Sequence, residues 1–208
     1  MFGSLKYRFN QLTEDHGSWW TNKYHHLKMK VFRAYSGFFA NIQCTVKGIK
    51  LGHGTEFYGQ PFFHRYPHSN IMFGDNCTIR SDQTSNQIGV NHKCILSTHK
   101  KGAILRIGNN CGLSGVSIGA AMEISIGNNV LFGANVIVTD WDWHEDRIDS
   151  QPAPVIIHDN VWIGVNSTVL KGVTIGENSI IGANSLVVKD IPANVIAGGN
   201  PCKVLRTK

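Results

Sequence analysis

Residues 155–187 read VIIHDNVWIGVNSTVLKGVTIGENSIIGANSLV, and an aliphatic residue returns at every sixth position. Steps of six pass through Ile157, Ile163, Val169, Ile175, Ile181 and Val187. This period is too long for a helix and too regular for ordinary strands, so each hexad supplies one short strand and one tight turn. Stacked hexads point the aliphatic column into a shared interior. The stretch therefore predicts a parallel β-helix.

The positions around the column agree with this prediction. Two residues before each column residue the chain has valine or serine, which are small enough to let three flat sheets meet closely. Glycine and asparagine fill the turns, as in Gly176–Asn178 and Gly182–Asn184. Turn residues often need a positive φ, which these two residue types tolerate best.

The period also appears earlier, with frame shifts, and sets the expected domain organisation. The earlier column residues are Leu51, Phe57, Phe63, Phe73, Ile79, Ile107, Leu113, Ile126, Phe132 and Val138. At three hexads per coil this predicts roughly seven coils in an all-β prism. We expect an N-terminal helical cap or arm over 1–45 and the β-helix domain over 46–208, with an extruded loop at 139–156 and a C-terminal tail at 196–208.

Composition narrows the possible partners. The net charge of +6 on 208 residues, without a long basic run, permits an anionic ligand but gives little support for nucleic acid, which we do not expect as a partner. The five cysteines form no CxxC pair, which excludes zinc-ribbon and redox motifs. No apolar stretch is long enough to span a bilayer and no signal peptide is recognisable, so we expect a soluble cytoplasmic chain.

An amphipathic helix is expected before the coils. Tyr24, Leu27, Val31, Tyr35 and Phe38 follow helical spacing, and lysines and an arginine lie between them. One interpretation is a cap or an arm that packs on a neighbouring subunit. The other is a basic surface, over residues 22–38, that makes peripheral contact with the inner face of an anionic membrane.

One interruption of the column, between Val138 and Ile157, has a composition foreign to the coils. From Val138 to Ile157 the step is 19 residues, one more than three hexads, and the segment includes DWDWH. Loops on a rigid scaffold often carry chemistry, and His144 can accept a proton at neutral pH. Asp142 or Asp140 is a candidate to orient its imidazole. The alternative is a polar surface loop whose tryptophans pack on the prism.

The loop DWDWH and the segment from Val161 to Arg206 resemble the hexapeptide-repeat acyltransferases, most closely the bacterial maltose, galactoside and polysaccharide O-acetyltransferases. The resemblance is strong over 105–206 and diffuse over 46–104. It implies a left-handed β-helix, a homotrimer with active sites between neighbouring prisms, and acetyl-CoA as donor with no metal. It further implies acetyl transfer to a sugar hydroxyl, in capsule, O-antigen or exopolysaccharide biosynthesis.

The resemblance also assigns roles to single residues. His144 matches the loop histidine that acts as general base, although galactoside-type relatives have a GHPVH-like segment where this chain has DWDWH. A thioester is already activated, so direct transfer without an enzyme nucleophile is expected. Ser114 resembles a polar position that faces the acceptor, and the alternative is an ordinary turn serine.

For acetyl-CoA the resemblance implies two groups of residues. Backbone groups of Gly164, Val165 and Ala183 would line the pantetheine arm, with Trp162 beside it unless that side chain only covers the prism. Three basic residues would meet the phosphates, namely Lys189, Lys203 and Arg206. Val165 and Val188 stand where relatives often have serine and threonine, which removes two hydroxyl contacts.

Other functions fit parts of the sequence. N-acetylation of an amino sugar, or acetylation of a small molecule, would use the same base. A γ-carbonic-anhydrase-type metal enzyme needs three converging histidines, and the spacing of His92, His99, His144 and His158 differs from that of this family. A non-catalytic scaffold would need neither the loop histidine nor the basic residues. The aromatic stretch 57–68 is a candidate sugar surface or a lid on the lower coils.

Overall fold

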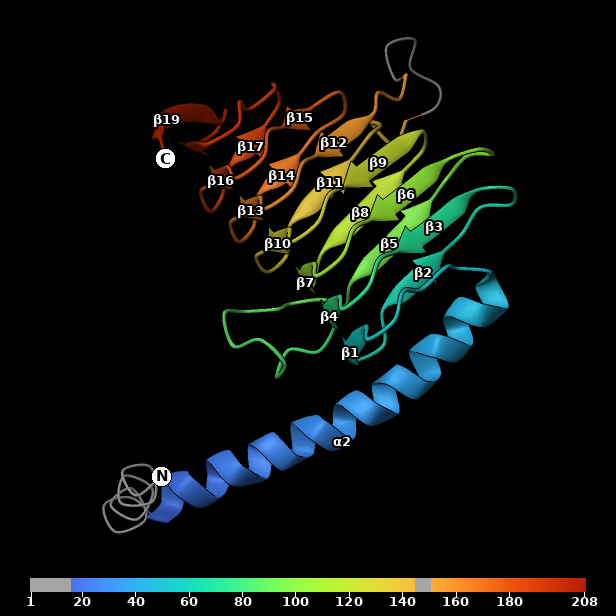
Figure 1. The fold of residues 1–208 in the computed structure, drawn as a ribbon, viewed down its shortest axis with the longest axis vertical. Coiled ribbons are helices and arrows are strands. Elements are labelled where there is room, and N and C mark those ends of the chain that lie inside the picture. The colour runs from blue at the N-terminus through green and yellow to red at the C-terminus, as the bar shows by residue number, and fades with distance from the viewer. Residues whose placement is uncertain (1–15, 145–150) are drawn as a thin grey trace.

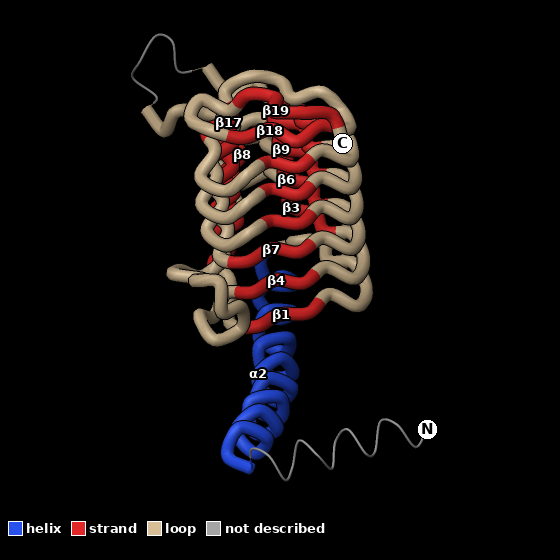
Figure 2. The backbone as a smooth tube through the Cα atoms, turned by 90° about the vertical axis from the view of Figure 1, so that its left-hand side faces the viewer, coloured by secondary structure: helices blue, strands red, loops and turns tan. Residues whose placement is uncertain are grey.

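The computed structural model describes residues 16–144 and 151–208, which form a prism of short strands with one long helix at its base (Figure 1). The strands pair in parallel, except that the C-terminal strand β19 (Lys203–Thr207) is antiparallel to β18 (Val195–Gly198). Three sheets make the faces of the prism, and each coil of the chain contributes one strand to each sheet in turn. Figure 2 shows these coils stacked one above another along the prism.

The strands are two to five residues long. The eight-stranded sheet contains β1 (Glu56–Tyr58), β4 (Thr78–Arg80), β7 (Gly112–Ser114), β10 (Leu131–Phe132), β13 (Trp162–Ile163), β16 (Ile180–Ile181), β18 (Val195–Gly198) and β19 (Lys203–Thr207). The six-stranded sheet contains β2 (Phe62–His64), β5 (Ile95–Thr98), β8 (Ser117–Ala120), β11 (Ile137–Thr139), β14 (Thr168–Val169) and β17 (Leu186–Val187). The five-stranded sheet contains β3 (Asn70–Phe73), β6 (Ile104–Ile107), β9 (Glu123–Ile126), β12 (Val155–Ile157) and β15 (Thr174–Ile175).

The predicted aliphatic column is confirmed as the core. Ile157 pairs in register with Ile126 below it and Ile175 above it, and all three are buried. Consecutive column residues face the interior from three different sheets, so residues three hexads apart lie on top of one another. The apolar area removed from water along these columns is the main stabilising contribution of the fold.

Asparagines hold the turns at one corner of the prism. Asn129, Asn160 and Asn178 all have φ values between 56° and 59°, in the left-handed region. Their side chains donate to one another up the stack, with N···O distances of 3.0 Å from Asn129 to Asn160 and 3.1 Å from Asn160 to Asn178. This ladder explains why asparagine, which tolerates that conformation, recurs at the turns.

A second long excursion separates β4 from β5 and was not predicted. The chain leaves the prism after Arg80 and resumes its strand at Ile95. Arg80 donates to the carbonyl of Ser85 at 2.5 Å, and Asn135 of a higher coil donates to the carbonyl of Gly89 at 2.8 Å. The excursion therefore folds against the prism and accounts for one frame shift in the hexads.

The helix α2 (His16–Lys47) is longer than the sequence indicated. It crosses the base of the prism and extends well beyond it (Figures 1 and 2). The helix's own residues that are buried against the prism are Ser36, Ala40 and Cys44. The apolar residues from Tyr24 to Phe38, whose spacing predicted an amphipathic helix, are instead exposed. No helix among the described residues combines the length and the apolar character that crossing a bilayer requires.

Candidate active site

A buried carboxylate anchors the extruded loop at the point where the loop leaves the prism. Asp140 follows β11 directly and is fully buried. Its two oxygens accept hydrogen bonds from the backbone N–H groups of Ala121 and Met122, both at 2.7 Å. Burial raises the pKa of this carboxyl, and the backbone donors partly oppose that shift. Asp140 thus fastens the start of the loop to the coil below.

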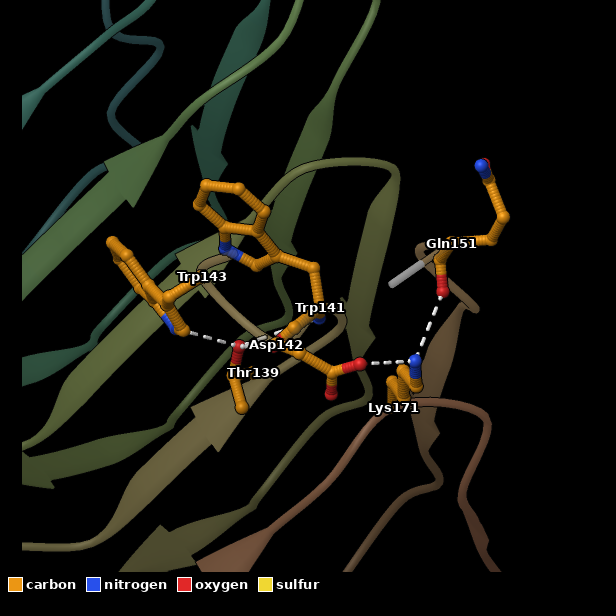
Figure 3. A network of polar contacts seen from close by, with 6 residues as sticks. All are labelled: Thr139, Trp141, Asp142, Trp143, Gln151 and Lys171. Atoms are coloured by element: carbon orange, nitrogen blue, oxygen red, sulfur yellow. Dashed lines mark hydrogen bonds and ion pairs between the residues drawn. The ribbon is translucent and has the colours of Figure 1, made fainter. Parts of the chain in front are cut away.

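Threonine and tryptophan side chains shape the next residues of the loop (Figure 3). The Oγ1 of Thr139 accepts a hydrogen bond from Nε1 of Trp143 at 3.1 Å and donates to the carbonyl of Trp141 at 2.8 Å. Trp143 has a φ of 63°, which a bulky residue rarely adopts. Its ring lies so close to Gly119 that a Cβ there would be 2.6 Å from it. Such a backbone conformation persists only where surrounding contacts enforce it.

His144 is exposed at the point where the described part of the loop ends. Asp142, one of its two candidate partners, instead pairs with Nζ of Lys171 at 2.5 Å (Figure 3). Among the described residues no hydrogen bond joins Asp142 to His144, so Asp142 as its orienting carboxylate stays a prediction. Residues 145–150 of the predicted loop lie outside the described residues.

Two further histidines lie beside the loop. His99 follows β5, and its ring centroid is 4.5 Å from that of Trp143, 5.3 Å from Trp141 and 5.6 Å from His64. Its Nε2 lies 2.8 Å from the hydroxyl of Ser97. Nε1 of buried Trp141 has no hydrogen-bond partner among the described residues. The four rings form a histidine–tryptophan cluster at the foot of the loop. In the described part of the chain, no group of three or more His, Cys, Asp or Glu side chains is arranged to hold a metal.

Burial lowers the pKa of His99 from its ordinary value of 6.5, and the neighbouring His64 lowers it further. The folded state therefore takes up this proton at a lower pH than the unfolded chain does. The stability that neutral His99 allows is therefore fully present above about pH 6.5, and it is lost as the pH falls toward the lowered pKa of the folded state. We expect the urea midpoint to fall between pH 7.5 and 5.5, and to fall less in His99→Gln. Equal falls in both proteins would contradict this assignment.

A second set of predicted residues lies at another corner, where the eight-stranded sheet turns into the six-stranded one. Gly164, Val165 and Ala183 follow β13 and β16, and a Cβ built on Gly164 would lie 2.5 Å from the nitrogen of Ala183. These turns therefore stack directly on one another. Lys203 pairs with Gly198, which lies above Gly182 at the same corner, so it adds a positive charge at the upper end of the stack.

Ser114 and Trp162 line one cavity of about 430 Å³ on the outer face of the eight-stranded sheet. Arg80 and Asn86 also line this cavity, and the amide of Asn86 donates to the hydroxyl of Ser114 at 3.1 Å. The side chain of Trp162 is 53% exposed, so it forms a wall of the cavity and does not cover the core. The structure thus brings together a residue predicted for the acceptor and one predicted for the coenzyme.

The remaining predicted residues are divided between corners. Lys189 follows β17, at the corner where Asp142 and Lys171 lie, and Arg206 pairs with Ile196 in the eight-stranded sheet. The loop with His144 connects the six-stranded sheet to the five-stranded one, whereas Gly164 and Ala183 lie at the opposite end of the six-stranded strands. Within one chain the histidine corner and the coenzyme turns therefore do not form one site.

Comparison with known proteins first defines the class. Residues 154–189 match the model of the bacterial transferase hexapeptide with six repeats, and residues 123–139 match that of the hexapeptide repeat of succinyl-transferase. AntD, an N-acyltransferase from Bacillus cereus solved with dTDP-4-amino-4,6-dideoxyglucose and coenzyme A, has a similar structure. The TM-score is 0.60 at 17% identity, covering 81% of this chain and 89% of that one. The predicted left-handed parallel β-helix is confirmed.

Two galactoside O-acetyltransferases are similar to this chain in sequence. The galactoside O-acetyltransferase of Escherichia coli K12 is 47% identical over 88 residues, which cover 40% of this chain and 43% of the relative. That of Lactococcus lactis is 48% identical over 90 residues, with the same coverage of 40% and 43%. The match thus spans less than half the length of either relative. The resemblance to hexapeptide-repeat acetyltransferases is confirmed.

The sequence did not indicate the histidine–tryptophan cluster. His64 and Ser97 are opposite each other in β2 and β5, but 33 residues separate them along the chain and the excursion after Arg80 lies between them. A coil of three hexads predicts a shorter repeat. The adjacency of His64 and His99 becomes visible only when the length of that excursion outside the prism is known.

Proposed function

We propose that this chain is an acetyl-CoA-dependent O-acetyltransferase that acts on a sugar hydroxyl in polysaccharide biosynthesis. The observation that carries the proposal is the exposed His144 on a loop fastened to the prism, in a chain whose matched segment is nearly half identical to galactoside O-acetyltransferases. The stacked turns with Lys203 at their upper end fit an elongated ligand with several phosphate charges.

In this reaction His144 acts as general base. Its imidazole removes the proton of the acceptor hydroxyl while the oxygen attacks the thioester carbonyl. The C–O bond forms, the C–S bond breaks, and the proton passes to the departing thiolate of CoA. A backbone N–H at the edge of a coil stabilises the negative charge that develops on the thioester carbonyl oxygen during the attack.

The separation of the two corners supports an assembly of several copies. Because one chain holds His144 and the turns of Gly164 and Ala183 at different corners, the histidine of one prism must meet the turns of its neighbour. Active sites at three equivalent junctions make a closed ring of three copies, which is the homotrimer that the resemblance implies.

The histidine–tryptophan cluster supports a sugar acceptor. Trp143 is adjacent to His144 in the chain, is 51% exposed and is held against Gly119. A rigid aromatic face with polar rings beside it suits a sugar, which has an apolar face and many hydroxyls. We therefore place the acceptor against Trp143 and His99, within reach of the loop histidine.

Acetyl transfer is tested by measuring release of free CoA thiol from acetyl-CoA with a panel of sugars and glycan intermediates, followed by mass spectrometry of the products. We expect one acceptor class to gain an ester-linked acetyl group. If no acceptor stimulates thiol release and acetyl-CoA does not bind, the proposal is wrong. An amide-linked product would replace O-transfer by N-transfer.

The basic residues on β19 give a separate prediction. Replacing Lys203 and Arg206 together with glutamine should raise the KM for acetyl-CoA about tenfold with little change in kcat, because these charges bind phosphates remote from the thioester. Lys50→Gln, an exposed lysine at the other end of the prism, is the control and should change neither constant. An unchanged KM in the double variant would remove these residues from the coenzyme site.

A further inference from the structure

The helix α2 has one face that binds the prism. Ser36 accepts a hydrogen bond from the backbone N–H of Gly59 at 3.0 Å, and Gln43 donates to Gln60 at 3.0 Å. Arg33 forms an ion pair with Glu56 at 2.5 Å. All these contacts involve the second half of the helix, while the first half extends past the prism (Figure 1). At about 1.5 Å per residue the whole helix is about 48 Å long.

The opposite face is an exposed apolar stripe along the full length of the helix. Its eight side chains are between 45% and 80% exposed: Trp20, Tyr24, Leu27, Val31, Tyr35, Phe38, Ile42 and Val46. At about 100° per residue these positions lie on one side, opposite the buried Ser36, Ala40 and Cys44. A monomeric protein rarely exposes so large a continuous apolar surface unless it binds something.

The stripe repeats every eleven residues. Trp20, Val31 and Ile42 are spaced by eleven, and so are Tyr24, Tyr35 and Val46. This period of about 3.67 residues per turn keeps the stripe nearly parallel to the axis of a straight helix, without the left-handed winding that a seven-residue repeat imposes. A straight stripe on a straight helix is suited to a flat surface.

The charge of the helix indicates what that surface is. Residues 16–47 contain five Lys or Arg side chains and no Asp or Glu, in a chain whose net charge is +6. Lys23 and Lys30 flank the stripe on one side and Lys28 on the other. Lys23 also lies over the rings of Trp19 and Trp20, at 4.7 and 5.4 Å. Aromatic side chains with basic residues on both flanks are the pattern of a helix that lies in the interface of an anionic bilayer.

The same charges argue against a second copy of the helix as the occupant. Helices that pack along an apolar stripe place opposite charges on its flanks. Here both flanks are basic, so two or three copies of α2 would bring lysines together with no acidic residue within 16–47 to neutralise them.

We propose that α2 binds the surface of an anionic lipid bilayer, with its apolar stripe in the interface and the flanking Lys23, Lys28 and Lys30 at the lipid headgroups. The prism is then held against the membrane by its base, through the second half of the helix. This proposal is independent of the acetyl transfer proposed above, since no residue of the stripe belongs to the candidate active site.

Flotation of the full-length protein with vesicles tests this proposal. We expect it to float with phosphatidylcholine vesicles that contain about 30% phosphatidylglycerol, and at least tenfold less with phosphatidylcholine alone or at about 0.5 M salt. Two variants should each lose at least tenfold in binding. One replaces Leu27, Val31 and Tyr35 with serine, and the other replaces Lys23, Lys28 and Lys30 with glutamine.

Matched controls use the prism. Met122→Ser with Ile156→Ser removes exposed apolar side chains, and Lys93→Gln with Lys101→Gln and Arg106→Gln removes exposed positive charge. Both should float like the unchanged protein, and all four variants should keep its thermal unfolding midpoint. If the stripe variant floats as well as the unchanged protein, the proposal is overturned. If that variant also sediments as a smaller assembly than the unchanged protein, the stripe belongs to contacts between copies of the chain.

Discussion

Replacing His144 with glutamine is expected to lower kcat for acetyl transfer by at least 100-fold, while acetyl-CoA binding stays unchanged. A positioned general base contributes about 10² to 10⁴ to the rate. Glutamine keeps much of the size and the hydrogen-bonding capacity of the side chain but cannot take the proton from the acceptor hydroxyl. The measurement is thiol release at saturating acetyl-CoA and acceptor, together with the dissociation constant for acetyl-CoA.

The control for this variant is His158→Gln. His158 is also exposed, but it follows β12 at the corner between the five-stranded and eight-stranded sheets, one strand beyond the extruded loop, and it is not part of the proposed mechanism. Its replacement should leave kcat within about twofold. If His144→Gln retains more than a third of the activity, another group is the base, and His99 beside the loop becomes the residue to test.

The coils could be predicted because each hexad needs one inward apolar residue whatever fills the turn. Ile157, Ile163 and Ile175 follow this rule without interruption. The excursion between Arg80 and Ile95 could not be placed, since its turn-forming residues do not show where the strand resumes. The prism-facing side of α2 was also not predictable, because Ser36, Ala40 and Cys44 are small and give a weaker hydropathy signal than the exposed stripe.

The candidate site divides in the same way. His144 was predicted because it stands in a segment whose composition differs from the coils, and composition is visible without the fold. The anchoring role of Asp140 depends on two backbone groups of the coil below, at Ala121 and Met122. The partner of Asp142, Lys171, comes from the coil above. Contacts between coils need the register, which the hexads give only where no frame shift intervenes.

Glycine turns stack closely at the corner between the five-stranded and eight-stranded sheets. Gly74, Gly108 and Gly127 follow one another there in successive coils. A Cβ added to Gly108 would lie 2.6 Å from the carbonyl carbon of Gly127, which is backbone and cannot rotate away. The coils would have to separate locally, which lengthens hydrogen bonds on both sides of the turn.

Gly108→Ala is therefore expected to destabilise the protein by about 3 kcal/mol, at the upper end of overpacking costs. The corresponding fall in the thermal midpoint is roughly 6–12 °C for a chain of this size.

Gly37→Ala is the matched control, because Gly37 lies within α2 and a Cβ there meets nothing within 4 Å. Alanine suits a helix better than glycine, so this control should stabilise by about 0.5–1 kcal/mol. The two identical substitutions should thus shift the midpoint in opposite directions. A Gly108→Ala protein that unfolds at the unchanged midpoint would show that the coils can part at this corner at little cost, and that the close stacking of glycine turns does not set the spacing of the prism.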